Sequence, residues 1–187
     1  MVSRKVFVVL VAIFFLAASA LAAEVEGVKF PDKMKVNGQD LTFNGGGKRT
    51  KFGLQVYVAG LYLKQKSGEA ARIIDGDETM EIRLQITSAL VSANRMKSAV
   101  MEGFEKSANG NTAPLKARID AFMGIFEGLD NNDVYEIAYV PGKGTEVSKN
   151  GAISSVIEGL DFKKALYGIW LGDKPAQEEL KAGMLGK

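Results

Sequence analysis

The chain has 187 residues with no cysteine and no histidine, and its 24 basic and 22 acidic residues give a formal net charge of +2. Without these two residue types, Ser-His-Asp and Cys-His catalysis, ordinary zinc sites and disulfide frameworks are excluded. The near-zero net charge excludes a general attraction to nucleic acid. We also expect no cofactor and no metal site.

The N-terminus has the pattern of a cleaved export signal. The basic dipeptide Arg4-Lys5 precedes an unbroken apolar run from Val6 to Leu16, and small residues then lead to Ala20-Leu21-Ala22. This order is typical of a signal peptide, and the run is shorter than the roughly 20 apolar residues that span a bilayer. We therefore expect a cleaved signal peptide over residues 1–22, and an exported domain over residues 23–187 with no membrane span.

The first predicted elements after this leader form a hairpin. Short strands are expected over residues 28–30 and 33–36, the dipeptide Asn37-Gly38 is typical of a two-residue hairpin turn, and the chain returns as a strand over residues 40–43. We expect the glycines Gly45–Gly47 to break this hairpin.

The stretch that follows, up to Leu63, is the most strand-like in the chain. It is expected to be one long strand, or two strands with a bend at Gly53. Its residues alternate between two faces. Phe52, Leu54, Val56 and Val58 are on the face predicted to be core, and Gln55, Tyr57 and Ala59 are on the face whose side chains end in polar groups.

The rest of the chain mixes helical and strand patterns. A period of two predicts a strand over residues 78–86, with Met80, Ile82, Leu84 and Ile86 in the core and Thr79, Glu81, Arg83 and Gln85 facing water. Helices are expected over residues 67–74, 92–107, 114–128, 161–171 and 175–185, and a three-strand meander over residues 134–139, 145–148 and 152–157. This order predicts one α+β domain in which a large, mostly antiparallel sheet is covered by helices.

Two apparent ligand loops fail on their spacing. Gly45-Gly46-Gly47-Lys48 resembles a phosphate-binding loop, but that pattern requires glycine where Thr42 stands and Ser or Thr where Arg49 stands. Asp75-Gly76-Asp77 resembles the start of a calcium loop, but Ile86 occupies the place of the required glutamate. Neither a nucleotide site nor a calcium site is predicted.

Arg49 and Tyr57 form the remaining candidate site. An arginine fork and a tyrosine hydroxyl suit the carboxylate of an otherwise apolar acid. In one straight strand at roughly 3.3 Å per residue, the two residues would lie about 26 Å apart, too far to share a ligand. Only a reversal of the chain near Gly53 brings them together, and without it Arg49 is a surface residue and Tyr57 a packing residue.

At these residues the chain resembles the chalcone isomerase-like family, in particular its exported bacterial members. The first match is Gly45-x-Gly47-x-Arg49 followed by Val-Tyr-Val-Ala-Gly-Leu-Tyr-Leu at residues 56–63, and the second is Ala-Leu-Tyr-Gly-Ile-Trp-Leu-Gly at residues 165–172 with Pro175. The resemblance implies an open-faced β-sandwich with an apolar cleft between the sheet and the helices. Some members of the family cyclise chalcones, and others bind fatty acids through an arginine and a tyrosine.

The resemblance places the family arginine on Arg49. Tyr57 falls where the plant isomerases keep a threonine and the fatty-acid binders a tyrosine. The tyrosine and asparagine that the isomerases also need fall on Arg95 and Glu102. The resemblance therefore implies ligand binding without the flavonoid-cyclising residues.

We therefore predict a monomeric binding protein of the bacterial periplasm. Its ligand would be a small amphiphile with an acidic head group, a fatty acid or related carboxylate, held by Arg49 and Tyr57. One alternative is an intramolecular lyase of the chalcone isomerase type, in which Arg49 polarises a developing oxyanion and Tyr57 organises a water. A second alternative is a non-catalytic envelope scaffold whose cleft is filled by its own side chains.

Overall fold

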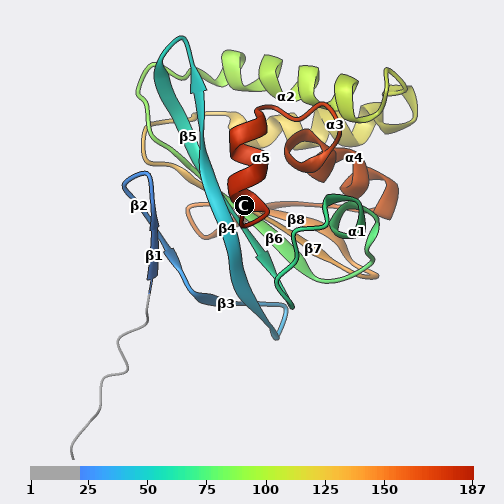
Figure 1. Ribbon diagram of the computed structural model, residues 1–187. Helices are drawn as coiled ribbons and strands as arrows, with labels where there is room; N and C mark the ends of the chain where they lie inside the picture. Colours follow the sequence, from blue (N-terminus) through green and yellow to red (C-terminus); the bar gives the residue numbers. More distant parts are fainter. Residues whose placement is uncertain (1–21) are drawn as a thin grey trace, which may run out of the picture.

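The computed structural model describes residues 22–187, so the expected signal peptide, apart from Ala22, lies outside the described residues. The main sheet has seven antiparallel strands in the order of the chain (Figure 1). These strands are β3 (Lys33–Val36), β4 (Gln39–Lys51), β5 (Leu54–Leu63), β6 (Met80–Ile86), β7 (Val134–Val140), β8 (Gly144–Lys149) and β9 (Ala152–Ile157). A separate hairpin is made by β1 (Ala22–Val25) and β2 (Val28–Pro31). The predicted antiparallel α+β fold is confirmed.

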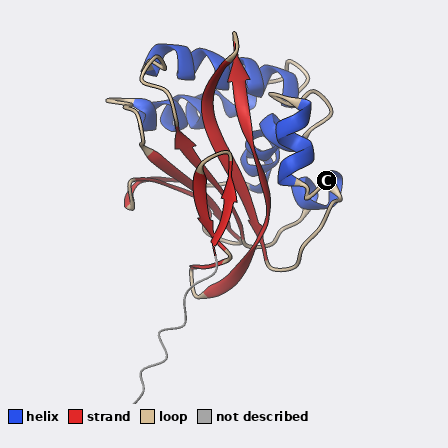
Figure 2. Ribbon diagram, turned by 60° about the vertical axis from the view of Figure 1, so that its left-hand side comes forward, coloured by secondary structure: helices blue, strands red, loops and turns tan. Residues whose placement is uncertain are grey.

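The helices gather on one side of the curved sheet, as Figure 2 shows. They are α1 (Ala70–Asp75), α2 (Ala93–Ser107), α3 (Lys116–Met123), α4 (Leu160–Leu171) and α5 (Glu178–Met184), with 3-10 turns at Ala113–Leu115 and Gly124–Phe126 on either side of α3. The main core lies between this layer and the sheet, and α4 is its centre, with Phe162, Leu166 and Tyr167 fully buried. Within residues 22–187, none of these helices has the length and apolarity needed to cross a membrane.

The glycines Gly45–Gly47 do not break the hairpin, contrary to the prediction. Strand β4 continues through them to Lys51, and only Asn44 is skipped in the pairing with β5. The reason for glycine here is the close approach of α5: a Cβ on Gly45 would lie 2.2 Å from the carbonyl oxygen of Gly183. These glycines therefore let a helix backbone pack directly on a strand backbone.

Asn44 itself fixes this contact. Its side-chain amide donates to the carbonyl oxygens of Met184 and Ser67 at 2.8 and 3.0 Å, and its side-chain oxygen accepts from the backbone amide of Ser67 at 2.8 Å. A bulge residue projects out of the regular strand pairing, and here it ties the C-terminal helix to the sheet.

The chain reverses at Phe52-Gly53, so that β4 and β5 form one long hairpin. Both turn residues have positive φ, 54° and 76°, which two-residue hairpin turns of type I′ require. The predicted faces are partly wrong, because Phe52 and Leu54 are exposed whereas Tyr57 and Ala59 are buried in the main core. The residue pattern placed Phe52 inside a strand, and the turn puts it outside.

The opposite face of the sheet is only partly exposed to solvent. The hairpin β1–β2 packs on it through Val28 and Phe30, which form a second cluster with Val58 and Tyr62. Glu81, predicted to face water, is only 4% exposed under this cover. A strand pattern cannot show that a separate hairpin covers part of a sheet's outer face.

Three helix boundaries also differ from the prediction. Helix α1 begins at Ala70 instead of Ser67, because the backbone of Ser67 is held by Asn44. The helix expected over residues 114–128 is divided into a short helix and two 3-10 turns. The last helix begins at Glu178, since the segment after Pro175 first crosses back to α4, where Ala176 donates to Ile169.

Candidate functional site

A cavity of about 580 Å³ lies between the helices and the concave face of the sheet. Its deep part is lined by buried apolar side chains from β6, β7, α2 and α4 and from the turn after α3: Leu84, Met96, Val100, Phe126, Ile137 and Ile169. Its mouth carries most of the charge and polarity: Arg49, Lys51, Asn94, Arg95, Glu102 and Lys106. An apolar interior with a few polar groups at one end is typical of sites for amphiphilic small molecules. The open cavity does not support a cleft filled by its own side chains.

Arg49 and Tyr57 both line this cavity and pair directly across β4 and β5. The reversal at Phe52-Gly53 therefore meets the geometric condition on which their joint role depends. Whether the two residues bind a ligand stays a prediction.

A bulge in β5 directs three neighbouring side chains to the same cavity. Arg49 pairs with Tyr57 and the next residue, Thr50, pairs with Gln55, so Val56 has no partner of its own on β4. The extra residue disturbs the alternation of faces, and Leu54, Val56 and Tyr57 all line the cavity. A strict period of two would have put Val56 and Tyr57 on opposite sides.

The Tyr57 hydroxyl is held by the helical layer. It accepts a hydrogen bond from the indole nitrogen of Trp170 on α4 at 3.0 Å, and Tyr57 is only 6% exposed. Burial raises the pKa of Tyr57, while the Trp170 hydrogen bond and the charge of Arg49 act in the opposite direction. The hydroxyl is therefore neutral at ordinary pH and has a proton to donate.

Gln177, just before α5, holds the end of β4. Its side-chain oxygen accepts from the Arg49 guanidinium at 3.1 Å and from the backbone amide of Thr50 at 2.9 Å. Arg49 is thereby supported on one side, and it is half-buried at the cavity mouth. A planar guanidinium has five donors, so this contact leaves others for a ligand.

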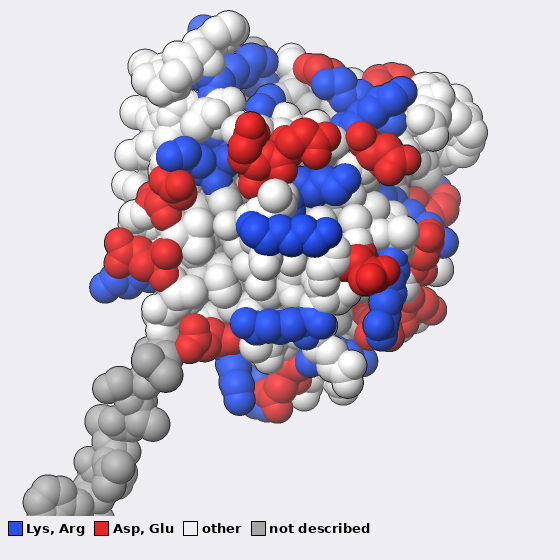
Figure 3. Space-filling model, viewed as in Figure 1, with Lys and Arg blue, Asp and Glu red and all other residues white. Residues whose placement is uncertain are grey.

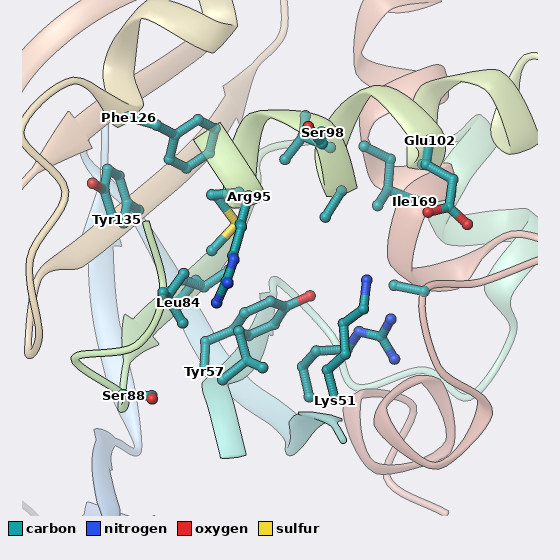
Figure 4. Close-up of a pocket in the computed structure, with 18 of the residues that line it drawn as sticks. Lys51, Tyr57, Leu84, Ser88, Arg95, Ser98, Glu102, Phe126, Tyr135 and Ile169 are labelled. Atoms are coloured by element: carbon teal, nitrogen blue, oxygen red, sulfur yellow. The ribbon is translucent and has the colours of Figure 1, made fainter. Parts of the chain in front are cut away.

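Three cations at the mouth lack an acidic partner in the described part of the chain. No ion pair there includes Arg49, Lys51 or Arg95. Glu102 is paired with Lys106 on the same helix at 2.6 Å, which lowers the pKa of the Glu102 carboxyl. Figure 4 shows the Tyr57 ring pointing into the cavity with the Lys51 and Arg95 side chains on either side of it. The mouth is therefore an electropositive end of an apolar cavity.

Sequence reasoning missed three contributors to this site. Lys51 lies two residues after Arg49 on the same strand face, a spacing that could have identified it. Trp170 belongs to the second family motif, which gave no sign of its hydrogen bond to Tyr57. Gln177 had no local pattern at all, since its partners are far away in the sequence. Arg95 and Glu102, the occupants of the positions of the isomerase tyrosine and asparagine, do line the cavity.

Comparisons with known proteins agree with this architecture. A family model described as chalcone isomerase-like matches residues 22–186. Among solved structures, the chain is similar to the crystal structure of an Arabidopsis thaliana fatty-acid binding protein, with 17% sequence identity and a TM-score of 0.66 over 85% of this chain and 92% of that one. At this identity the likeness shows the fold. No curated protein matches the sequence.

Proposed function

The chain belongs to the chalcone isomerase-like family, and on that premise we propose that it binds a fatty acid or a related carboxylate amphiphile. The tail lies in the apolar cavity, and the head group contacts Arg49 and the hydroxyl of Tyr57. The fatty-acid binding protein of the same fold supports this choice of ligand class.

The observation that carries the proposal is the joint position of Arg49 and Tyr57 at the mouth of an apolar cavity. Its volume of about 580 Å³ is within the range of about 300–1,000 Å³ that small-molecule sites occupy. An apolar tail gains free energy on leaving water, and a carboxylate left at the mouth meets cations without an acidic partner. An uncharged apolar molecule would leave these cations unused.

The neutral Tyr57 hydroxyl adds directional selectivity. Because it already accepts from Trp170, its proton is directed to a second acceptor, and a carboxylate oxygen beside Arg49 is well suited to that role. A ligand with an ammonium head group would face repulsion from Arg49 and nearby Lys51 and Arg95.

We further propose that the protein is exported and acts in the bacterial periplasm as a monomer. The support for export is the N-terminal pattern of Arg4-Lys5, an apolar run and small residues ending at Ala22.

The test is fatty-acid binding by purified residues 23–187. Native mass spectrometry with lipid extraction should identify a co-purified carboxylate, and calorimetric titration should give its affinity. A charge-assisted hydrogen bond contributes roughly 1.5 to 3 kcal/mol, so Arg49→Ala should weaken binding about ten- to a hundredfold. Arg72→Ala, at an exposed arginine on α1, is the matched control and should bind like the parent. No uptake of fatty acid, or an Arg49→Ala variant that binds normally, would overturn the proposal.

A lyase of the chalcone isomerase type is the second candidate. It is favoured by Arg49, which would neutralise a developing oxyanion beside a protonated Tyr57. Cyclisation of a chalcone faster than in buffer, and its loss in Arg49→Ala, would support this activity. A rate equal to that in buffer would exclude chalcones as the substrate class.

A further inference from the structure

The large exposed apolar side chains of the described residues occur at two places. Ile153 and Val156 lie on the edge strand β9, whereas Phe52, Leu54 and Leu90 all line the mouth of the cavity. Phe52 is 92% exposed, Leu90 64% and Leu54 49%. In Figure 1 the β4–β5 turn protrudes beside the loop that leads into α2. The apolar residues at the mouth therefore come from two separate segments that project at the same end.

Phenylalanine at position 52 is not explained by the fold. With φ of 54°, this residue adopts a left-handed conformation, which costs free energy for a bulky side chain and is preferred by glycine and asparagine. At other non-glycine positions of this kind the chain does use asparagine: Asn37, Asn109, Asn132 and Asn150, besides Glu26. An Asn-Gly turn would suit the local backbone better than Phe52-Gly53. A strained, almost fully exposed aromatic side chain therefore points to a role outside the folded core.

Cations surround these apolar residues. The Lys51 ammonium lies 5.8 Å from the centre of the Phe52 ring. Arg95 is exposed and donates to the carbonyl oxygen of Leu90 at 3.2 Å, so it is fixed to the second apolar segment. Figure 3 shows uncharged surface at the β4–β5 turn, at the upper left, with Lys and Arg side chains next to it. The expected domain has 24 − 2 = 22 basic and 22 acidic residues without Arg4 and Lys5, so this positive end is a local feature.

We propose that this end of the molecule docks on an anionic phospholipid bilayer. The docking rim consists of the apolar side chains of Phe52, Leu54 and Leu90, which enter the interfacial layer, and of Lys51 and Arg95, which contact lipid phosphates. Apolar residues combined with cations on one surface are the usual means of reversible binding to anionic membranes. The rim surrounds the cavity mouth, so a ligand that the proposed function assigns to the cavity would enter from lipid without crossing water.

The shape of the rim favours a bilayer over a folded protein partner. A stable protein interface buries roughly 1,600 Å² and is organised around a packed centre. Here Phe52 lies in a two-residue turn, Leu54 begins β5 and Leu90 lies in a separate loop, and all three line the cavity mouth. A fluid lipid layer accommodates separate protruding side chains, and it supplies the negative charge that Lys51 and Arg95 lack among residues 22–187.

The test is sedimentation with lipid vesicles that contain no free fatty acid, so that its result does not depend on ligand binding. The protein is residues 23–187, the expected domain, which hold the whole seven-strand sheet and both hydrophobic clusters and so fold without the leader. We expect binding to phosphatidylglycerol-containing vesicles, weaker binding to pure phosphatidylcholine, and a loss of binding at high salt.

Three variants separate the contributions. Phe52→Asn should lower the vesicle partition coefficient about tenfold, because one aromatic side chain no longer leaves water. Its thermal stability should not fall, since Asn-Gly suits the turn, so lost binding is not lost folding. Lys51→Gln should lower the partition coefficient about fivefold on anionic vesicles only. Ile153→Asn, at a similarly exposed apolar residue on the far edge strand, should bind like the parent.

Three outcomes would overturn the assignment. The first is a parent chain that stays in the supernatant with anionic vesicles. The second is a Phe52→Asn variant that sediments as well as the parent. The third is a parent chain that light scattering shows to be a dimer and that Phe52→Asn converts to a monomer, since this would assign the rim to a second copy of the chain.

Discussion

The indole nitrogen of Trp170 donates a hydrogen bond to the hydroxyl of Tyr57 at 3.0 Å, which joins the helical layer to the sheet inside the cavity. Indole nitrogen is a donor only, so the Tyr57 oxygen must accept. The Tyr57 proton is then directed elsewhere, and no other described residue accepts it in a hydrogen bond. The structure thus prepares Tyr57 to donate to a group in the cavity.

Tyr57→Phe should weaken fatty-acid binding about tenfold. The variant keeps the ring and removes the donor to a carboxylate, a hydrogen bond worth roughly 1.5 kcal/mol or more. Calorimetric titration measures the change. Tyr139→Phe is the matched control, because its hydroxyl donates to Asp77 at 2.6 Å and does not line the cavity. Equal affinity of Tyr57→Phe and the parent chain would remove Tyr57 from the site.

Trp170→Phe should have a smaller effect on binding, of about two- to fivefold, since Tyr57 keeps its hydroxyl and loses only the group that orients it. In the double variant with Tyr57→Phe, the second change should add little, because the hydroxyl that Trp170 orients is already gone. Titration of the parent, the two single variants and the double variant completes this double-mutant cycle. Strictly additive losses would show that Trp170 acts through cavity shape and not through Tyr57.

The sequence predicted the sheet because strand patterns are local. The strand expected over residues 78–86 and the meander after Val134 each follow from neighbouring residues, and the structure has both, although Glu81 on the predicted water-facing side is buried. The run Gly45–Gly47 was misinterpreted for the opposite reason. Its cause is the backbone of α5, which is distant in the sequence, so no local pattern could show that β4 continues there.

The site was predictable only in part. Arg49 and Tyr57 were recognisable by residue type and by family resemblance, but their meeting depended on a turn at Phe52-Gly53 that a strand pattern obscures. The side chains that support them, Trp170 and Gln177, come from the last quarter of the chain. Hydrogen bonds between distant segments leave no periodic trace in a single sequence.

Gly45→Ala should destabilise the protein by about 1 to 3 kcal/mol, the usual cost of overpacking. Its Cβ would lie 2.2 Å from the Gly183 carbonyl oxygen, a backbone atom that moves only if α5 moves. Displacement of α5 also moves Gln177, so binding that depends on Arg49 should weaken as well. Chemical denaturation measures the first effect and fatty-acid titration the second.

Gly124→Ala provides the control for this change. Gly124 has a helical φ of −59° and no atom within 4 Å of an added Cβ. Alanine is preferred over glycine in such a conformation, so the variant should be as stable as the parent or slightly more stable. Similar destabilisation by both substitutions would contradict the close packing of α5 on β4.

Glu81 lies on the face of the sheet that β1 and β2 cover. One oxygen of this carboxyl is buried without a hydrogen-bond partner. Burial raises the pKa of Glu81 from 4.5 to about 8, and the negative charge of Glu136 adds to this, while Arg83 acts in the opposite direction. The folded protein therefore holds a proton at neutral pH that the unfolded chain releases.

This difference sets the direction of the pH dependence. Between pH 4.5 and about 8 the folded state binds more protons than the unfolded state, so the Glu81 contribution to stability is complete below pH 4.5 and is lost as pH rises through 8. Glu81→Gln resembles the protonated form at every pH. As pH rises from 4.5 to about 8, the parent loses stability and the variant does not, so the difference in unfolding free energy should grow in favour of the variant. The scale is about 1.36 kcal/mol for each unit by which the pKa is raised. Denaturant unfolding of both proteins at several pH values measures this gap. A constant gap for Glu81→Gln would mean that Glu81 is ionised in the folded protein.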